Sequence, residues 1–92
     1  KNEILTEFSL SENYPNPFNP ATTIRFSLKT HSNTSLRVFD TIGRHVITLI
    51  DGLIAPGEYD ITWHASHLPS SAYFVQMKSG DFVKTRKMVL LK

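Results

Sequence analysis

Residues 22–28 read Thr-Thr-Ile-Arg-Phe-Ser-Leu, and this stretch decides the fold class. Its apolar side chains, at positions 24, 26 and 28, alternate with polar ones. Because successive side chains of a β-strand point to opposite faces, this alternation is typical of a strand with one buried face. Residues 58–63 repeat the pattern with Tyr59, Ile61 and Trp63. Both stretches are therefore predicted to be strands that face one core.

Several shorter stretches have the same character and are predicted to form the remaining strands. Turn residues separate them, and no helical period interrupts them. We expect these strands at residues 35–39, 46–50, 72–77 and 82–91, while Phe8 and Leu10 are compatible with one more short strand. About seven short strands favour an all-β fold, an immunoglobulin-like antiparallel β-sandwich, over a barrel. Its predicted core consists of Ile24, Phe26, Leu36, Val38, Tyr59, Ile61 and Trp63.

The length of 92 residues suits one domain, and the absence of cysteine leaves its stability to packing alone. The sandwich is assigned to residues 13–92, and residues 1–12 to a linker or short first strand. The chain begins without Met, a signal peptide or a membrane-spanning apolar run, so we expect it to be a fragment whose parent protein carried any signal. The formal net charge of +2 does not call for a nucleic-acid partner.

A proline-rich segment precedes the strand at residues 22–28. Residues 13–20 read Asn-Tyr-Pro-Asn-Pro-Phe-Asn-Pro. Three prolines in six positions exclude a helix and a central strand. We therefore predict a stiff crossing loop that presents Tyr14 and Phe18 to apolar surroundings.

The last predicted strand changes its pattern near its end. Lys84 and Arg86 alternate with Val83 and Thr85, but residues 88–91 are all apolar. A strand that is apolar on both sides must be covered on both faces or await a partner. An exposed edge at the chain end would also be a natural template for strand addition.

No arrangement of polar residues indicates a catalytic centre, a cofactor or a metal site. His64 and His67 are three residues apart, but they lie in a predicted loop without the cysteine or carboxylate that would complete a ligand set. The carboxylates fall at strand ends, in turns and at outward positions, namely Asp40, Asp51, Glu58, Asp60 and Asp81. Such positions are explained by solubility and turn hydrogen bonds, so we predict no enzyme activity.

Two binding alternatives stay open from the residues alone. Trp63 could belong to a sugar-stacking surface, although its alternation with Tyr59 and Ile61 favours the core. Tyr73 and Phe74 are adjacent and must point to opposite faces, so at least one is less deeply buried. The basic residues near the chain end, Lys84, Arg86, Lys87 and Lys92, lack interleaved aromatics and read as a solvated strand face rather than a nucleic-acid site.

Taken in order along the chain, these motifs resemble the type A C-terminal sorting domain of the type IX secretion system, and also the related immunoglobulin-like domain of flagellar hook-capping proteins. The resemblance covers residues 13–92. It starts with the proline-rich segment and residues 23–28 and ends with Lys-Met-Val-Leu-Leu-Lys at residues 87–92. The individual motif residues on which it rests are Asn16, Pro17, Phe18, Asn19 and Pro20 within the proline-rich segment, followed by Gly43, Arg44, Gly57, Trp63, Leu68, Tyr73 and Phe74.

The resemblance implies a non-catalytic signal at the C-terminus of a secreted cargo protein. An outer-membrane translocon would recognise the domain after the cargo reaches the periplasm, and a sortase-like surface protease would then remove it. The residues expected to be read are Lys87, Met88, Val89, Leu90, Leu91 and Lys92, together with Ser71 and Tyr73. Ser71 departs from the family, which usually has glycine there. A glycine needed for positive φ would make this loop bend differently here.

Overall fold

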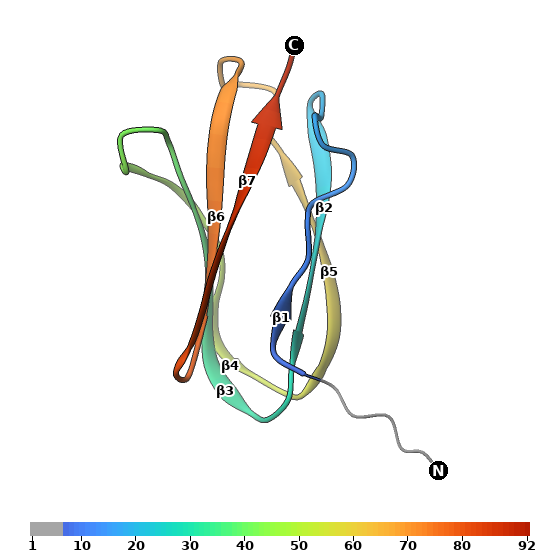
Figure 1. The fold of residues 1–92 in the computed structure, drawn as a ribbon, viewed down its shortest axis with the longest axis vertical. Helices are drawn as coiled ribbons and strands as arrows, with labels where there is room; N and C mark the ends of the chain where they lie inside the picture. The colour runs from blue at the N-terminus through green and yellow to red at the C-terminus, as the bar shows by residue number, and fades with distance from the viewer. Residues whose placement is uncertain (1–6) are drawn as a thin grey trace.

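The computed structural model describes residues 7–92 as a sandwich of two antiparallel β-sheets (Figure 1). Sheet A has the strand order β1-β2-β5, and sheet B has the order β4-β3-β6-β7. The strands are β1 (Ser9–Leu10), β2 (Ala21–Leu28), β3 (Ser32–Phe39), β4 (His45–Ile54), β5 (Gly57–His64), β6 (Ser71–Ser79) and β7 (Phe82–Leu90). The predicted all-β sandwich of seven strands is confirmed.

The chain crosses repeatedly between the sheets, which is the behaviour expected of an immunoglobulin-like sandwich. It leaves β2 in sheet A for the β3–β4 hairpin in sheet B, returns as β5 beside β2, and crosses again to β6 and β7. Tyr73, near the start of β6, adds a second feature of that topology. Its hydroxyl donates a hydrogen bond of 2.7 Å to the carbonyl of Pro69, four residues upstream, and so fixes the corner before β6.

The core lies between the two sheets and follows the predicted alternation. Five of the predicted core residues are fully buried, namely Ile24, Phe26, Leu36, Val38 and Trp63. Tyr59 and Ile61 lie on the same face of β5 but are only partly buried, because β5 is an edge strand. The rings of Phe26 and Tyr59 stack with centroids 5.3 Å apart.

Two strands of sheet B are longer than predicted. β3 begins at Ser32 instead of residue 35, and β4 continues through Asp51 and Gly52 to Ile54 instead of ending at residue 50. The ladder explains both differences, because Thr34 pairs with Gly52 and Ser35 pairs with Asp51. Pairing between neighbouring strands therefore overrides the weak strand preference of these residue types.

The hairpin between β6 and β7 has a two-residue turn. Ser79 pairs with Phe82, so Gly80 and Asp81 are the two turn residues. Gly80 has a φ of 58°, the value expected for glycine at the first central position of a type II′ turn.

Candidate recognition site

Residues 87–91 are divided between the core and the solvent. Met88 and Leu90 point inward and are fully buried. Val89 lies on the outer face of sheet B and is half-buried, whereas 56% of Leu91 is exposed. The apolar tail is therefore a core strand on one side and an accessible surface on the other.

The outer edge of this part of β7 is covered by the proline-rich segment. The N–H of Phe18 donates to the carbonyl of Val89 at 2.9 Å, and the N–H of Leu91 donates to the carbonyl of Phe18 at 3.0 Å. These bonds form a short parallel bridge between Phe18 and Leu90. Figure 1 shows the segment after β1 rising beside β7 before the chain turns into β2. At residues 89–91 the strand edge is therefore already paired, and it is not free for strand addition by a partner.

Asn16 extends this cover with its side chain. Its Oδ1 accepts a hydrogen bond of 3.0 Å from the N–H of Val89, and its Nδ2 donates one of 3.3 Å to the carbonyl of Lys87. The side-chain amide thus supplies the acceptor and donor that a neighbouring strand would present. Sequence reasoning identified Asn16 only as part of a motif, because the pairing joins positions 73 residues apart.

Buried polar contacts fix the path of the proline-rich segment. The Nδ2 of Asn13 donates to the carbonyl of Pro15 at 3.1 Å and to Oγ1 of Thr22 at 2.9 Å. Thr22 in turn donates from Oγ1 to the same Pro15 carbonyl at 2.9 Å. On the other side of the segment, Tyr14 and Thr23 exchange two backbone hydrogen bonds of 2.9 Å. The segment therefore leaves sheet A at Tyr14, contacts β7 of sheet B at Asn16 and Phe18, and returns to sheet A at Ala21.

An aromatic cluster connects the segment with the core. The ring of Trp63 lies 5.6 Å from that of Phe18 and 5.7 Å from that of Tyr73. All three side chains are buried. The prediction that Phe18 enters apolar surroundings is confirmed, but the same prediction for Tyr14 is wrong, since 81% of Tyr14 is exposed. The bridge to Thr23 turns Tyr14 onto the outer face of sheet A.

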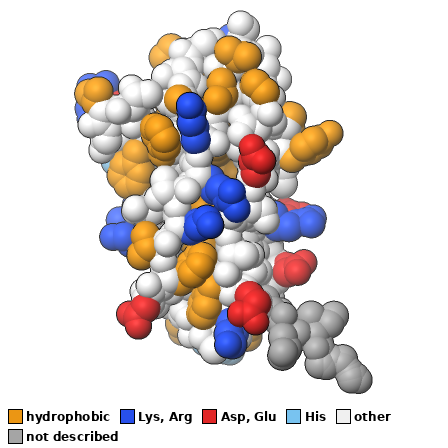
Figure 2. Space-filling model, in the orientation of Figure 1, with side chains coloured by type: hydrophobic (Ala, Val, Ile, Leu, Met, Phe, Trp, Pro, Cys, Tyr) orange, Lys and Arg blue, Asp and Glu red, His pale blue; other side chains and the backbone are white. Residues whose placement is uncertain are grey.

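The basic side chains in the first half of β7 reach solvent, as predicted, since Lys84 is exposed and Arg86 is only partly buried. Both nevertheless share one side of the strand with Met88, while Val83 points outward and is 54% exposed. Nε of Arg86 donates to the carbonyl of Leu10, in the two-residue strand β1, at 2.8 Å. Lysine and arginine side chains lie near the middle of the face in Figure 2.

The chain end and the start of β6 lie next to the tail. Ser71 pairs with Leu90, and Tyr73 pairs with Met88. Ser71 has no positive φ, so replacing the family's usual glycine causes no unusual backbone bend at this position. The N–H of Lys92 donates to Oγ of Ser70 at 2.9 Å, which holds the chain end against the loop before β6.

The motif glycines lie in turns away from the tail. Gly43 has a φ of 84° in the β3–β4 hairpin, where Arg44 donates from its backbone and from Nε to the Asp40 carboxylate, each at 2.9 Å. These hydrogen bonds, led by that from the Arg44 backbone, lower the pKa of Asp40. Gly57 has a φ of 144° at the start of β5. Asn19, Pro17 and Pro20 are exposed, and the Pro20 carbonyl accepts from the N–H of Ala65 at 2.8 Å.

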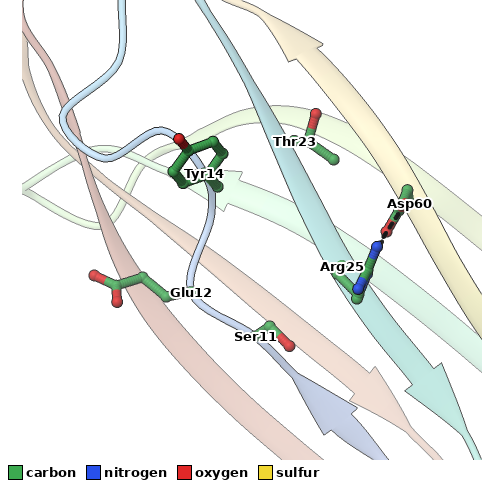
Figure 3. A pocket seen from close by; sticks show the side chains of 6 residues that line it. All are labelled: Ser11, Glu12, Tyr14, Thr23, Arg25 and Asp60. Atoms are coloured by element: carbon green, nitrogen blue, oxygen red, sulfur yellow. Dashed lines mark hydrogen bonds and ion pairs between the residues drawn. The ribbon is translucent and has the colours of Figure 1, made fainter.

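The part of the chain that the structure describes contains no group of three or more histidine or acidic side chains arranged to hold a metal ion. Within residues 7–92, no helix is long and apolar enough to cross a membrane. A pocket of about 470 Å³ lies on the outer face of sheet A and is lined by Ser11, Glu12, Tyr14, Thr23 and the ion pair of Arg25 and Asp60 (Figure 3). Arg25 binds the Asp60 carboxylate through two hydrogen bonds of 2.8 and 3.1 Å.

Together, the fold and the tail define a small immunoglobulin-like sandwich whose C-terminal strand is built into the core. A family model described as the secretion system C-terminal sorting domain matches residues 12–91. The chain therefore belongs to this family of type IX secretion sorting domains, and the resemblance seen in the sequence is confirmed. No curated protein and no solved structure matches the chain significantly.

Proposed function

We propose that this domain is a non-catalytic signal that directs a larger cargo protein, joined to it in the same chain, across the outer membrane through the type IX secretion translocon. Residues 13–92 act as the signal, and residues 1–12 lead to the cargo. The cargo first enters the periplasm of a Gram-negative bacterium. A sortase-like protease then removes the domain and leaves the cargo attached to the cell surface.

Membership of the sorting-domain family carries this proposal, and the geometry of the tail supports a particular form of recognition. The edge of β7 at Val89 and Leu91 is already hydrogen-bonded to Phe18 and Asn16. A partner that reads the folded domain therefore contacts outward side chains instead of adding a strand. Lys87, Leu91 and Lys92 are exposed and available for such contacts. Met88, Leu90 and Tyr73 are buried and hold the tail in position.

Export of the full-length parent protein from its native host tests the signal role. Deleting residues 87–92 should leave folded, active cargo in the periplasm. This deletion also removes Met88 and Leu90 from the core, so it can impair folding. Substitutions at exposed positions distinguish a loss of recognition from a loss of folding. Lys87→Glu combined with Leu91→Ser should also trap the cargo, whereas Val83→Ser, which changes a similarly exposed apolar residue of the same strand, should not. Normal surface levels after the deletion would rule out the sorting role.

A carbohydrate-binding accessory role is the second candidate, and exposed Tyr14 is the observation that favours it. Trp63 cannot serve as the stacking platform because it is buried. A sugar would have to use the pocket in Figure 3, where Arg25 and Asp60 already bond each other. Calorimetry with oligosaccharides, zinc and calcium should therefore show no saturable heat. Micromolar oligosaccharide binding that is lost in Tyr14→Ala would favour this second role.

A further inference from the structure

A row of side chains crosses all four strands of sheet B on its outer face. His45 of β4 pairs with Phe39 of β3, Phe39 pairs with Phe74 of β6, and Phe74 pairs with Lys87 of β7. We call these four residues the aromatic row. An outward face of an antiparallel sheet normally carries polar side chains, so two adjacent phenylalanines there are unusual. Both are half-buried, which leaves part of each ring accessible.

The apolar surface continues from the aromatic row to the chain end. Ala72 and Val89 form the next pair along β6 and β7, and both are half-buried on the same outer face. Beyond them lies exposed Leu91. The outward side of the tail and the aromatic row therefore form one continuous surface.

A hollow beside Phe39 gives this surface a concave part. It has a volume of about 330 Å³ and is lined by Arg37, Phe39, His45 and Thr48 from β3 and β4. The His45 ring meets the Phe39 ring edge-on, with centroids 5.9 Å apart. Such a hollow can accept one apolar side chain of a partner, the usual anchor of a protein interface.

The charges around the row are mainly positive. Arg37 lies beside the row and Lys87 is its last member on β7, and neither takes part in an ion pair among the described residues. Asp51 and Lys78 lie further along the face, one on each side of Ser35. The complementary surface is therefore apolar at its centre and carries carboxylates at its rim.

We propose that the aromatic row and the hollow beside it form the docking surface for a protein of the export route that presents an apolar patch with an acidic rim. This inference rests on the proposed sorting function and extends its recognition site from the tail across sheet B to Phe39 and Arg37. A purely structural cross-strand pair of aromatics would contribute to stability only. If the pair also forms a docking surface, its loss lowers export even when the variant is correctly folded.

Export of the full-length parent protein tests the extension. Threonine keeps a high strand preference, so Phe39→Thr with Phe74→Thr should preserve the sheet while removing the apolar contact. We expect surface levels to fall about tenfold, as for loss of central interface aromatics, with intact cargo retained in the periplasm. Tyr14→Thr is the matched control, because it removes an exposed aromatic from the other sheet, and it should leave export unchanged.

A charge variant keeps the inference testable where the aromatic variant does not fold. Arg37→Glu should also lower export, because it reverses the charge that would meet the partner's carboxylates. Lys29→Glu makes the same change of charge at an exposed residue outside sheet B and should export normally. Folding of each variant is checked by its cooperative thermal unfolding.

The outcomes separate this inference from the proposed function. If the tail variants trap the cargo but the folded aromatic variant and Arg37→Glu are exported normally, recognition is confined to the tail and the extension is wrong. If the aromatic variant is unfolded, normal export of Arg37→Glu alone overturns the extension. If deletion of residues 87–92 leaves export unchanged, the sorting role itself fails.

Discussion

The side-chain oxygen of Asn16 accepts a hydrogen bond of 3.0 Å from the backbone N–H of Val89, 73 residues later in the chain. With the second bond from Asn16 to the Lys87 carbonyl, one side chain caps two backbone groups at the edge of β7. Exposed strand edges promote association with other chains. The cap therefore protects the strand that carries the tail.

Replacing Asn16 should weaken this protection. Asn16→Ala leaves the N–H of Val89 without its partner and should lower the free energy of unfolding by about 1–2 kcal/mol. Asn19→Ala changes the same residue type in the same segment, but its exposed side chain makes no hydrogen bond with another described residue, so it should cost less than about 0.5 kcal/mol. Urea denaturation of both variants measures the difference. Equal stabilities would show that the cap contributes nothing.

Trp63 should be the most sensitive core position. It is buried between Phe18 and Tyr73 and so joins the proline-rich segment to sheet B. Trp63→Ala should cost about 3–5 kcal/mol, enough to unfold much of a domain of this size. Chemical denaturation or loss of cooperative thermal unfolding would detect this. A loss below about 1 kcal/mol would contradict the buried position.

Tyr73→Phe should remove the hydrogen bond to Pro69 without leaving a cavity. The carbonyl of Pro69 would lose a partner at 2.7 Å, and we expect a loss of about 1–2 kcal/mol at neutral pH. Burial, with a smaller contribution from the charge of Asp40, raises the pKa of Tyr73 above its ordinary value of 10.0. The neutral phenol is therefore favoured in the folded state.

The raised pKa of Tyr73 determines how the stability of the domain changes at alkaline pH. The stabilisation from Tyr73 is complete below the unfolded-state pKa of 10.0 and declines as pH rises through the folded-state pKa. Tyr73→Phe should therefore be less sensitive than the parent domain to alkali. Thermal unfolding measured from about pH 8 to about pH 11 gives the comparison. Parallel pH profiles of the two proteins would contradict the assignment.

The ion pair between Arg25 and Asp60 should affect stability at acid pH. Hydrogen bonds from Arg25 lower the pKa of Asp60 below its ordinary value of 3.8. Its contribution is thus complete above pH 3.8 and is lost as pH falls through the folded-state pKa. Asp60→Asn should reduce the acid sensitivity of the unfolding midpoint, and an unchanged acid sensitivity would contradict this role of the ion pair. Both side chains of the ion pair are exposed, so the effect on the unfolding midpoint should also be smaller at high salt concentration.

Local patterns in the sequence determined the fold class, most of the core and the rigid character of the proline-rich segment. The alternation in residues 22–28 and 58–63 identified two strands that each turn one face to the core, because strand periodicity is a property of neighbouring residues. The same patterns did not show that Lys84 and Arg86 share one side of β7 with Met88. The pairing of β7 with β6 sets that orientation, and it brings Arg86 to the carbonyl of Leu10 in β1.

Only the tertiary structure decided what surrounds the tail. Residues 88–91 are equally apolar in the sequence, yet Met88 and Leu90 enter the core while Leu91 stays exposed. The pairing of Asn16 with Val89, and of Phe39 with Phe74 across sheet B, likewise joins distant parts of the chain. Hydrogen bonds and cross-strand packing depend on which segments meet in space. Local periodicity does not predict which segments meet, because that depends on the long-range pairing of whole strands.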